Sequence, residues 1–334
     1  MPNALERWTN SPLAPLLRPA SWLYGWEASR RFSRAKPVRV RAPVICIGNP
    51  TVGGTGKTPT AMAVARTALA MGRKPAFVTR GYGRTVRKSE PITVEPDRHS
   101  AAEVGDEPLL LAAMAPTFVA KERPLAARQA IAGGCDLIVM DDGFQSRTVF
   151  PDEAALLIDR AAGIGNGRVL PAGPLRMPFA KQLMAADTLV VIDSGGPSAS
   201  GELTRAAARG GRHVVRARSG VADVERWRNR PIVVFCGLGN PTKLTRQLEA
   251  GGANIVAQWN FEDHHAYTER DVRALAHLAH EKEGTLVTTA KDAVKLRALQ
   301  TPLDYEIAEL RLEFDPGGLE GMVRRAIDGY EKRR

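Results

Sequence analysis

The amino-acid sequence predicts an α/β fold, with a parallel sheet flanked by helices and a second, smaller α/β domain. Short apolar runs typical of buried strands alternate with stretches of helical periodicity, and this alternation is characteristic of parallel sheets. The chain has 334 residues, which is long for one hydrophobic core and favours two domains. A new strand, glycine loop and helix begin after residue 227, so we expect one domain over 37–219 and the smaller one over 220–334.

The expected strands are apolar runs of four or five residues. They cover 43–47, 75–79, 116–120, 136–140, 154–158, 188–192, 213–217, 232–235, 254–258 and 285–289. Helical patterns lie between most of them, and the clearest, at 60–72, ends at a glycine, as helices commonly do. Residues 104–114 predict a further helix with Asp106 at its N-cap, because a short carboxylate there accepts hydrogen bonds from the first turn.

The composition narrows the class of protein. Hydrophobic residues make up 44% and charged residues 25%, which excludes a disordered chain, a collagen-like repeat and a disulfide scaffold. Cys46, Cys135 and Cys236 stand far apart in apolar runs, so we expect buried reduced thiols that form no metal site. The sequence contains no apolar run of about 18 residues and no evident secretory signal, so we expect no membrane-spanning helix.

Positive charge is concentrated at the N-terminus. The net charge is +11, and residues 1–41 alone hold eight basic and two acidic groups. Trp8, Trp22 and Trp26 lie beside these cations, a combination that suits the headgroup layer of an anionic membrane. Residues 1–36 are therefore expected either to lie on a membrane or to pack on their own domain. Because the charge is local, and aromatic and basic residues are not interleaved along a strand, we expect no nucleic-acid partner.

The strongest functional signal is a glycine-rich segment between the first expected strand and the helix that follows it. The segment consists of Thr51, Val52, Gly53, Gly54, Thr55, Gly56, Lys57 and Thr58. It matches the phosphate-loop pattern G-x-x-x-x-G-K-[ST] except at Thr51, which stands in place of the first glycine. The backbone N–H groups of such a loop hold phosphate oxygens, so the segment predicts a P-loop NTPase-like sheet. Lys57 is expected to bridge the β- and γ-phosphates and Thr58 to bind Mg²⁺; the alternative is a glycine turn that binds nothing.

An acidic partner for this loop follows the apolar run at 136–140. Asp141 and Asp142 stand at its end, where a carboxylate can hold Mg²⁺ directly or through water. Two adjacent Asp residues can also cap the next helix or turn. Side chains of neighbours on an extended chain point apart, so the choice between the two carboxylates stays open. Together with the phosphate loop, the pair predicts an NTPase or an NTP-dependent transferase without naming the acceptor.

Eight motifs follow one another over residues 48–296. They are GNPTVGGTGKTP (48–59), TRGYGR (79–84), VGDEP (104–108), DDGFQ (141–145), LPAGPLRMP (170–178), FCGLGNP (235–241), DHHAY (263–267) and TTAKDAVKL (288–296). In content and order this set resembles one family, the tetraacyldisaccharide 4′-kinases of lipid A synthesis. A threonine in place of the first glycine of the loop, as at Thr51, also resembles that family's pattern. The sequence departs from the family's usual pattern at Ser146, where His is more common, and at Ala290, where Glu is.

The resemblance implies ATP-dependent phosphorylation of the 4′-hydroxyl of a tetraacyldisaccharide 1-phosphate, with Mg²⁺, at the cytoplasmic face of the inner membrane. It also implies that Asp106 accepts the hydroxyl proton and that His264 supports it. A carboxylate within about 3 Å of the hydroxyl can act in this way, although a helix N-terminus stabilises the anion and weakens the base. From the residues alone, a helix cap explains Asp106 and a solvated loop position explains His264.

Five further side chains are weaker candidates for contact with the substrate or ATP. They are Arg80, Tyr82, Glu107, Arg123 and Arg176. The arginines lie in loops rich in Pro and Gly and suit phosphate groups; Arg176 is favoured because it lies within a motif of the family. A solvated or packed position is the alternative for each.

Two other interpretations compete with the kinase. Within enzymes, the phosphate loop also suits a GTPase or a metallochaperone-type NTPase that needs no sugar acceptor. Outside enzymes, the basic composition suits a nucleic-acid-binding protein. The glycines at 237–239 lack the third glycine of a dinucleotide fingerprint and are expected to form only a turn after a strand.

Overall fold

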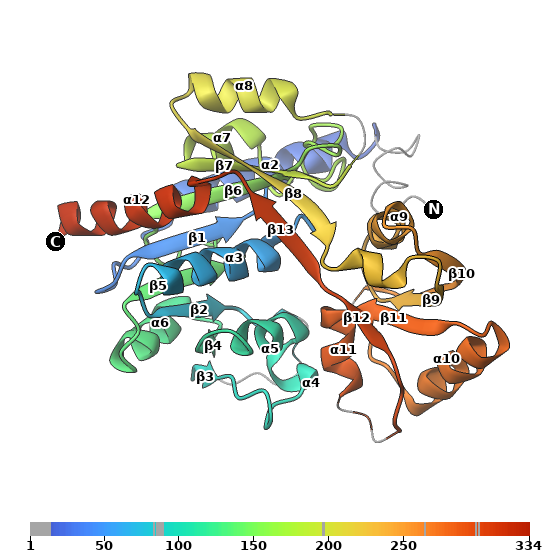
Figure 1. Cartoon of the computed structure of the whole chain (residues 1–334). Helices are drawn as coiled ribbons and strands as arrows, with labels where there is room; N and C mark the ends of the chain where they lie inside the picture. The colour runs from blue at the N-terminus through green and yellow to red at the C-terminus, as the bar shows by residue number, and fades with distance from the viewer. Residues whose placement is uncertain are drawn as a thin grey trace.

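The computed structural model of the chain contains a large sheet and a smaller one, each flanked by helices (Figure 1). It describes residues 15–82, 84, 90–195, 198–263, 265–297, 299 and 301–334. Strands and helices alternate along most of the chain. The α/β class predicted from that alternation, with a second and smaller sheet, is confirmed.

The large sheet has nine strands. In sheet order they are β13 (Leu310–Phe314), β8 (His213–Val221), β7 (Thr188–Asp193), β6 (Glu153–Asp159), β1 (Val44–Gly48), β5 (Leu137–Asp141), β2 (Pro75–Thr79), β4 (Thr117–Val119) and β3 (Ile92–Thr93). The two outermost strands, β13 and β3, are antiparallel to their neighbours, and the strands between them are parallel. The central strands are buried over their whole length, as expected for a parallel sheet covered on both faces.

Helices cover both faces of the large sheet. One face carries α3 (Lys57–Ala70), α5 (Asp106–Ala112) and α12 (Gly318–Arg333), and α4 (Ala101–Val104) precedes α5. The other face carries α2 (Arg18–Arg34), α6 (Arg123–Ala132), α7 (Phe179–Met184) and α8 (Gly201–Arg209). The buried face of α3 is made of small residues such as Ala61, Ala65 and Ala68, so the helix packs close to the strands that hold the phosphate loop.

The smaller sheet has four parallel strands. In sheet order they are β10 (Asn254–Asn260), β9 (Pro231–Cys236), β11 (Thr285–Thr289) and β12 (Glu306–Ala308). Helix α9 (Pro241–Ala250) packs on one face beside the 3₁₀-helix η1 (Val224–Trp227); α10 (Glu269–Glu281) and α11 (Ala290–Leu296) pack on the other. Each face thus has a hydrophobic cluster of its own.

The last part of the chain returns to the large sheet. Strand β13 pairs with β8, and α12 buries Leu319, Met322 and Val323 in the cluster that α3 shares. The smaller unit is therefore an insertion between β8 and β13, whereas the sequence led us to expect a unit over all of 220–334. The difference arises because the pairing of β13 with β8 joins strands that are far apart in sequence, and no local pattern reports such a contact.

The two units meet along α5 and α11. Val294 of α11 packs against the apolar cluster around α4 and α5. Two ion pairs cross the same boundary: Lys291 with Asp106, and Lys243 with Asp159. Asp159 ends β6, whereas Lys243 and Lys291 follow β9 and β11, so carboxyl ends of strands from both sheets face the boundary. Ligands of open α/β sheets bind at such ends.

All ten strands expected from apolar runs are present, with ends shifted by a few residues. Strands β3, β12 and β13 were not expected, because they are short or only half-buried and lack a continuous apolar run. The expected cap of the helix at 104–114 needs correction: Gly105 is the N-cap of α5, with φ of 96°, and Asp106 is the first helical residue.

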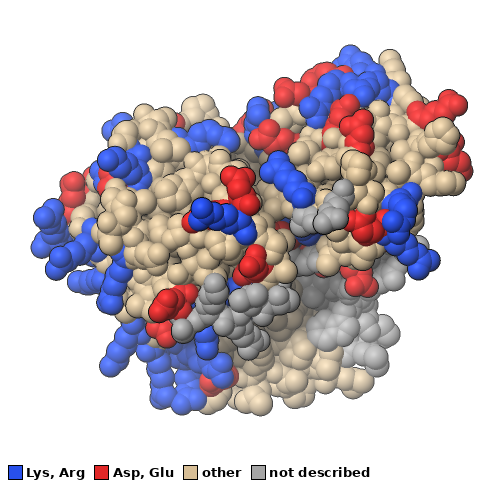
Figure 2. Space-filling model, turned by 90° about the horizontal axis from the view of Figure 1, so that it is seen from below, with Lys and Arg blue, Asp and Glu red and all other residues tan. Residues whose placement is uncertain are grey.

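The burial of the cysteines follows the expectation from the sequence. The three cysteines are buried and unpaired. Within the part of the chain that the structure describes, helices are too short or too polar to cross a membrane. Seen from below, Lys and Arg side chains gather at one side of the large unit, whereas basic and acidic side chains are mixed over the smaller unit (Figure 2).

Candidate functional site

The glycine-rich loop joins the end of β1 to the start of α3. Its positive φ angles fall on Gly53 (108°) and Gly56 (80°), in the region that other side chains disfavour. Thr51 instead lies in an antiparallel bridge with Leu175, which explains why a β-branched residue is accepted in place of the usual first glycine. Lys57 is the first residue of α3, so the loop sits at a helix N-terminus.

The loop is open at Gly53 and Gly54. Among the described residues, no heavy atom lies within 4 Å of the position that a Cβ would take at Gly53 or Gly54. The backbone of the loop is fixed at Val52, because the Val52 N–H donates to the Pro174 carbonyl at 2.9 Å. The hydroxyl of Thr55 is buried without a hydrogen-bond partner in the described part of the chain. An open turn of backbone N–H groups at a helix N-terminus suits phosphate.

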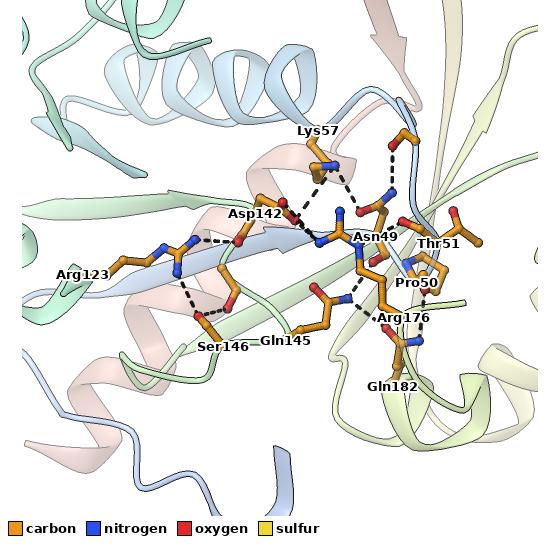
Figure 3. Close-up of polar contacts among 12 residues, drawn as sticks. Asn49, Pro50, Thr51, Lys57, Arg123, Asp142, Gln145, Ser146, Arg176 and Gln182 are labelled. Atoms are coloured by element: carbon orange, nitrogen blue, oxygen red, sulfur yellow. Dashed lines mark hydrogen bonds and ion pairs between the residues drawn. The ribbon is translucent and has the colours of Figure 1, made fainter. Parts of the chain in front are cut away.

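Lys57 lies at the rim of the open turn. Its Nζ donates to Asn49 Oδ1 at 3.2 Å and lies 4.0 Å from Asp142 Oδ1 (Figure 3). Asn49 in turn donates through Nδ2 to the Gly53 carbonyl at 3.2 Å. A lysine held by one amide and one distant carboxylate can exchange these partners for phosphate oxygens, which are stronger acceptors.

Asp141 lies beside the start of α3, because the register of β1 and β5 pairs Ile47 with Asp141. Thr58 Oγ1 donates to Asp141 Oδ2 at 3.1 Å. The Asp141 side chain is buried, and no described residue makes a hydrogen bond to its other oxygen, Oδ1. Burial raises the pKa of Asp141 to about 7, and the negative charge of Glu107 adds to the rise.

This pair of oxygen ligands fits Mg²⁺. A buried carboxylate oxygen without a partner, next to a threonine hydroxyl, is the kind of donor set that a hard cation takes. The described residues hold no cluster of three or more His, Cys, Asp or Glu that could bind a metal alone. Mg²⁺ commonly takes one or two protein carboxylates together with substrate phosphates, and Asp141 with Thr58 is a set of that size.

Asp142 has other partners, two arginines among them (Figure 3). Arg176 Nη1 donates to both Asp142 carboxylate oxygens at 3.2 and 3.3 Å, and Arg176 Nε donates to the Thr51 carbonyl at 3.2 Å. Arg123, which is buried, donates to the Asp142 carbonyl at 2.8 Å and to Ser146 Oγ at 3.1 Å. Both arginines thus brace the turn after β5 beside the phosphate loop, and Ser146 takes part in that network.

Two glutamines support the start of the phosphate loop. Gln145 Nε2 donates to the Asn49 carbonyl at 2.7 Å and to Gln182 Oε1 at 3.0 Å. Gln182 is fully buried, and its Nε2 donates to the carbonyls of Met177 and Pro50 at 2.8 and 3.3 Å. This partly buried network fixes the backbone of Asn49 and Pro50, just before the glycine-rich loop.

Asp106 lies at the boundary between the units and is 4% exposed. Its Oδ1 accepts a hydrogen bond from the Glu107 N–H at 2.9 Å, and its Oδ2 lies 3.6 Å from Lys291 Nζ. Lys291 Nζ also lies 3.2 Å from Asp263 Oδ1. The charge of Glu107 acts on both Asp141 and Lys291, so the start of α5 links the phosphate-loop side of the site to the smaller unit.

The loop after β2 borders this region. Arg80 and Tyr82 are both exposed, Tyr82 to 72%. Burial lowers the pKa of Arg123, and the nearby positive charge of Arg80 lowers it further. A Cβ at Gly105 would stand 2.7 Å from the Tyr82 carbonyl oxygen, so this loop packs directly against the turn that carries Asp106.

His264 lies outside the described residues. Its neighbour His265 pairs through Nε2 with Asp271 Oδ2 at 3.2 Å and stacks on Phe261 with ring centroids 4.6 Å apart. The His265 side chain therefore packs and bonds within the smaller unit, near the first turn of α10.

The sequence did not single out several of these residues. They are Asn49, Gln145, Gln182, Asp263 and Lys291. All but Gln182 stand inside motifs of the resembling family. Their polar or charged side chains within those motifs are the feature of the sequence that could have identified them. Gln182 lies in a helix outside the motifs, and only the folded chain brings it to the loop.

Comparisons with known proteins extend the resemblance to nearly the whole chain. The family model described as tetraacyldisaccharide-1-P 4′-kinase matches residues 13–328. The tetraacyldisaccharide 4′-kinase of Methylorubrum extorquens (strain PA1) is 46% identical over 299 residues, which cover 89% of each chain. The protein of the same name from Chelativorans sp. (strain BNC1) is 42% identical over 323 residues, which cover 95% of this chain and 93% of that one.

A solved structure shows the same fold. The "apo" form of LpxK from Aquifex aeolicus, in complex with ATP, superposes with a TM-score of 0.71 at 24% identity, covering 94% of this chain and 99% of that one. The resemblance carried by the eight motifs is thus confirmed by full-length similarity in sequence and in fold. The chain belongs to the tetraacyldisaccharide-1-P 4′-kinase family.

Proposed function

We propose that this chain transfers the γ-phosphoryl group of ATP to the 4′-hydroxyl of a tetraacyldisaccharide 1-phosphate, a step in lipid A synthesis. The observation that carries the proposal is the open glycine turn with Lys57 at its rim, found in a chain of the 4′-kinase family. A GTPase or metallochaperone-type NTPase without a sugar acceptor is not favoured, because the relatives are named for a lipid sugar kinase.

In this proposal the loop at 51–58 holds the phosphates of ATP. Its backbone N–H groups bind phosphate oxygens, and Lys57 leaves Asn49 and Asp142 to bridge the β- and γ-phosphates. Positive charge from Arg176 and Arg123 lies directly behind the turn, and Arg80 stands near Arg123. Most of the rate then comes from positioning and from neutralising charge as it moves to the leaving oxygen.

We assign Mg²⁺ to Thr58 and Asp141. The support is the buried Asp141 oxygen to which no described residue makes a hydrogen bond, next to the threonine hydroxyl. When bound, Mg²⁺ neutralises negative charge on the phosphates. Asp142, which the sequence left as an equal candidate, is paired with Arg176 and Lys57 and so is the weaker ligand.

Asp106 is proposed to accept the proton of the 4′-hydroxyl. It is buried at the boundary of the units, near the exposed loop that carries Tyr82, and Glu107 beside it interacts with Asp141. His264 is proposed to support Asp106, as the family resemblance implies. Arg80 and Tyr82, at the open edge, are proposed to contact the sugar or its 1-phosphate.

The N-terminal segment is proposed to hold the protein on the cytoplasmic face of the inner membrane. Large apolar side chains are exposed there, among them Trp22 (75%), Leu23 (59%) and Trp26 (53%). The Arg30 guanidinium lies 5.6 Å from the centre of the Trp26 ring. A cavity of about 430 Å³ lies between α2 and the segment around Val169. Aromatic rings beside cations suit the headgroup layer, and the acyl chains of the substrate then stay near the bilayer.

A phosphotransfer assay tests the central proposal. The protein is incubated with γ-labelled ATP, Mg²⁺ and the tetraacyldisaccharide 1-phosphate, with a second reaction lacking the lipid. We expect label in the lipid fraction and little ATP consumption without acceptor. Hydrolysis of ATP at equal rates in both reactions, with no labelled lipid, would instead support an acceptor-free NTPase.

The role of Asp106 is tested with Asp106→Ala. Turnover should fall strongly while ATP affinity changes little, because Asp106 acts on the acceptor hydroxyl rather than on the nucleotide. The measurements are kcat for phosphotransfer and Kd for ATP. A tenfold loss of ATP affinity with intact turnover would contradict the assignment.

The membrane proposal is tested by vesicle binding. A Trp22→Ser/Trp26→Ser variant should bind anionic phospholipid vesicles more weakly than the wild type in a sedimentation assay. Trp259→Ser, which changes a partly exposed tryptophan of the smaller unit, is the control. Equal binding by all three proteins would show that α2 does not hold the protein on the membrane.

A further inference from the structure

Lys291 joins the smaller unit to the proposed base. It is the second residue of α11, and its side chain is 16% exposed. Its Nζ lies 3.6 Å from Asp106 Oδ2 in the large unit and 3.2 Å from Asp263 Oδ1 in its own unit. One ammonium group is therefore shared between carboxylates on opposite sides of the boundary.

The surroundings of Lys291 keep it positively charged. Burial by itself would lower the pKa of Lys291, but the carboxylates of Asp106, Asp263 and Glu107 outweigh burial and raise this pKa above its ordinary value. A fixed cation this close to a buried carboxylate stabilises its ionised form. The elements packed around Asp106 carry these charged groups: Lys291 on α11, Asp263 after β10, Glu107 on α5, and Arg80 and Arg84 on the loop after β2.

The two oxygens of Asp106 are held from different sides. Oδ1 accepts the N–H of the next residue, Glu107, so the backbone of α5 fixes it. Oδ2 faces Lys291, so the smaller unit orients it. The orientation of the carboxylate is therefore set in part by α11, where this helix lies against α5.

We propose that Lys291 is a positioning residue for phosphotransfer: it orients Asp106 Oδ2 toward the acceptor hydroxyl and keeps that carboxylate ionised, and it does so only while the two units are together. The inference rests on the proposed function, in which Asp106 takes the hydroxyl proton. Contact between the two units then also orients Asp106 and keeps it ionised.

The chemical step balances without a proton on or off Lys291. The 4′-oxygen forms a bond to the γ-phosphorus, the bond from that phosphorus to the β–γ bridging oxygen breaks, and its electron pair leaves with ADP. The hydroxyl proton passes to Asp106. As Asp106 becomes neutral, Asp263 continues to compensate the charge of Lys291, so the ammonium group keeps an anionic partner through the step.

A second ion pair across the same boundary provides a matched control. Lys243 of α9 bonds to Asp159 Oδ2, and Asp159 is as buried as Asp106, at 4% exposed. Asp159 ends β6, however, and does not lie on α5. Loss of Lys243 removes one ion pair across the boundary, whereas the packing of α11 on α5 still holds Lys291 beside Asp106.

The experiment measures kcat for lipid phosphorylation as a function of pH, at saturating ATP and acceptor, for the wild type and three variants. Lys291→Met should move the acidic limb of the profile to higher pH by about one unit and lower kcat at pH 7 by about tenfold, with KM for ATP little changed. Lys291→Arg keeps the charge, so it should leave the acidic limb in place and restore part of kcat. Lys243→Met should also leave the acidic limb in place.

Three results would overturn the inference: an unshifted acidic limb in Lys291→Met, an equal shift in Lys243→Met, or the same shift in Lys291→Arg as in Lys291→Met. Thermal unfolding and ATP binding are measured on each variant, and Lys291→Gln replaces Lys291→Met if the latter does not fold. A wild type that labels no lipid would count against the proposed function instead, so the two failures are distinct.

Discussion

Each unit contains a glycine turn that links a central strand to a helix, but the two turns differ in what fills them. In the large unit, no described atom approaches the positions where a Cβ would stand at Gly53 and Gly54. In the smaller unit, a Cβ at Gly237 would stand 2.9 Å from the Glu262 carbonyl oxygen, and the Gly237 N–H donates to Asp292 Oδ2 at 3.1 Å. The second turn already holds an anion from its own chain.

The lysines beside the two turns differ in the same way. Lys57 donates to an amide and lies 4.0 Å from a partly exposed carboxylate. Lys295 lies 2.8 Å from Asp292 Oδ1, and this pair is almost completely buried. A turn with available N–H groups and an exchangeable lysine suits a ligand, whereas a turn occupied by an internal carboxylate stabilises the fold. Glycines after a strand therefore indicate a turn, and an Asp from a distant part of the chain, present or absent in that turn, decides whether it stabilises the fold or is open to a ligand.

The largest expected effect separates the two lysines. Lys57→Ala should lower kcat for phosphotransfer by about 10³-fold, because it removes a cation that acts on charge developing in the transition state. Lys295→Ala, the control in the filled turn, should keep turnover per folded molecule within a few-fold of the wild type. Initial rates corrected for the folded fraction check both. Equal losses would mean that the open turn has no special part in catalysis.

The second largest expected effect is on stability, and it is greater for the variant in the turn of the smaller unit. Asp292→Ala should lower the free energy of unfolding by about 3 kcal/mol, because it leaves the buried Lys295 ammonium without its carboxylate. Asp142→Ala removes a carboxylate that is 36% exposed and should cost less than about 1 kcal/mol. Urea denaturation measures both. A larger loss for Asp142→Ala would reverse the roles inferred for the two turns.

Much of the fold follows from local patterns. The central strands of a sheet covered on both faces must be apolar throughout, so runs such as 44–48 and 137–141 are visible in the sequence. Strand β13 is only half-buried, and its pairing with β8 depends on residues about ninety positions away. The sequence therefore predicted a second unit but not its insertion into the first.

The candidate site, like the fold, could be predicted only in part from local motifs. The phosphate loop and the pair Asp141–Asp142 are local motifs, and the structure brings them together. The different partners of the two carboxylates arise from tertiary contacts, since Arg176 reaches Asp142 from a distant loop. Lys291 was missed for the same reason: its position in a motif indicates importance, but only the packing of α11 on α5 places it beside Asp106.

Glycine-to-alanine variants distinguish the two turns by their effects on ATP binding and on stability. Gly53→Ala places a side chain at φ of 108°, which should lower the free energy of unfolding by about 1–2 kcal/mol through strain in the folded state and also weaken ATP binding by about tenfold. Gly237→Ala should leave ATP affinity unchanged but lower stability by about 1–3 kcal/mol, because the added carbon meets a backbone carbonyl. Calorimetric titration and urea denaturation distinguish them, and the same response from both would break the contrast.

The smallest effect concerns Asp263, and its sign is opposite to that of Lys291→Met. The Asp263 side chain is 45% exposed, so solvent screens its charge. Asp263→Asn removes one negative charge from the neighbourhood of Asp106, so the Asp106 carboxylate stays ionised to lower pH. The acidic limb of kcat should therefore move to lower pH by less than about half a unit. The pKa of Lys291, which Asp263 helps to raise, falls toward its ordinary value of 10.5 and leaves Lys291 charged at neutral pH.

The control for this variant is Asp263→Glu, which keeps the charge and should keep the wild-type profile. A shift of the acidic limb to higher pH in Asp263→Asn would mean that Asp263 acts on Asp106 mainly by holding Lys291 in place, and not through its own charge. A shift to lower pH in Asp263→Asn, together with a shift to higher pH in Lys291→Met, would be the signature of one ammonium group shared between two carboxylates across the boundary of the units.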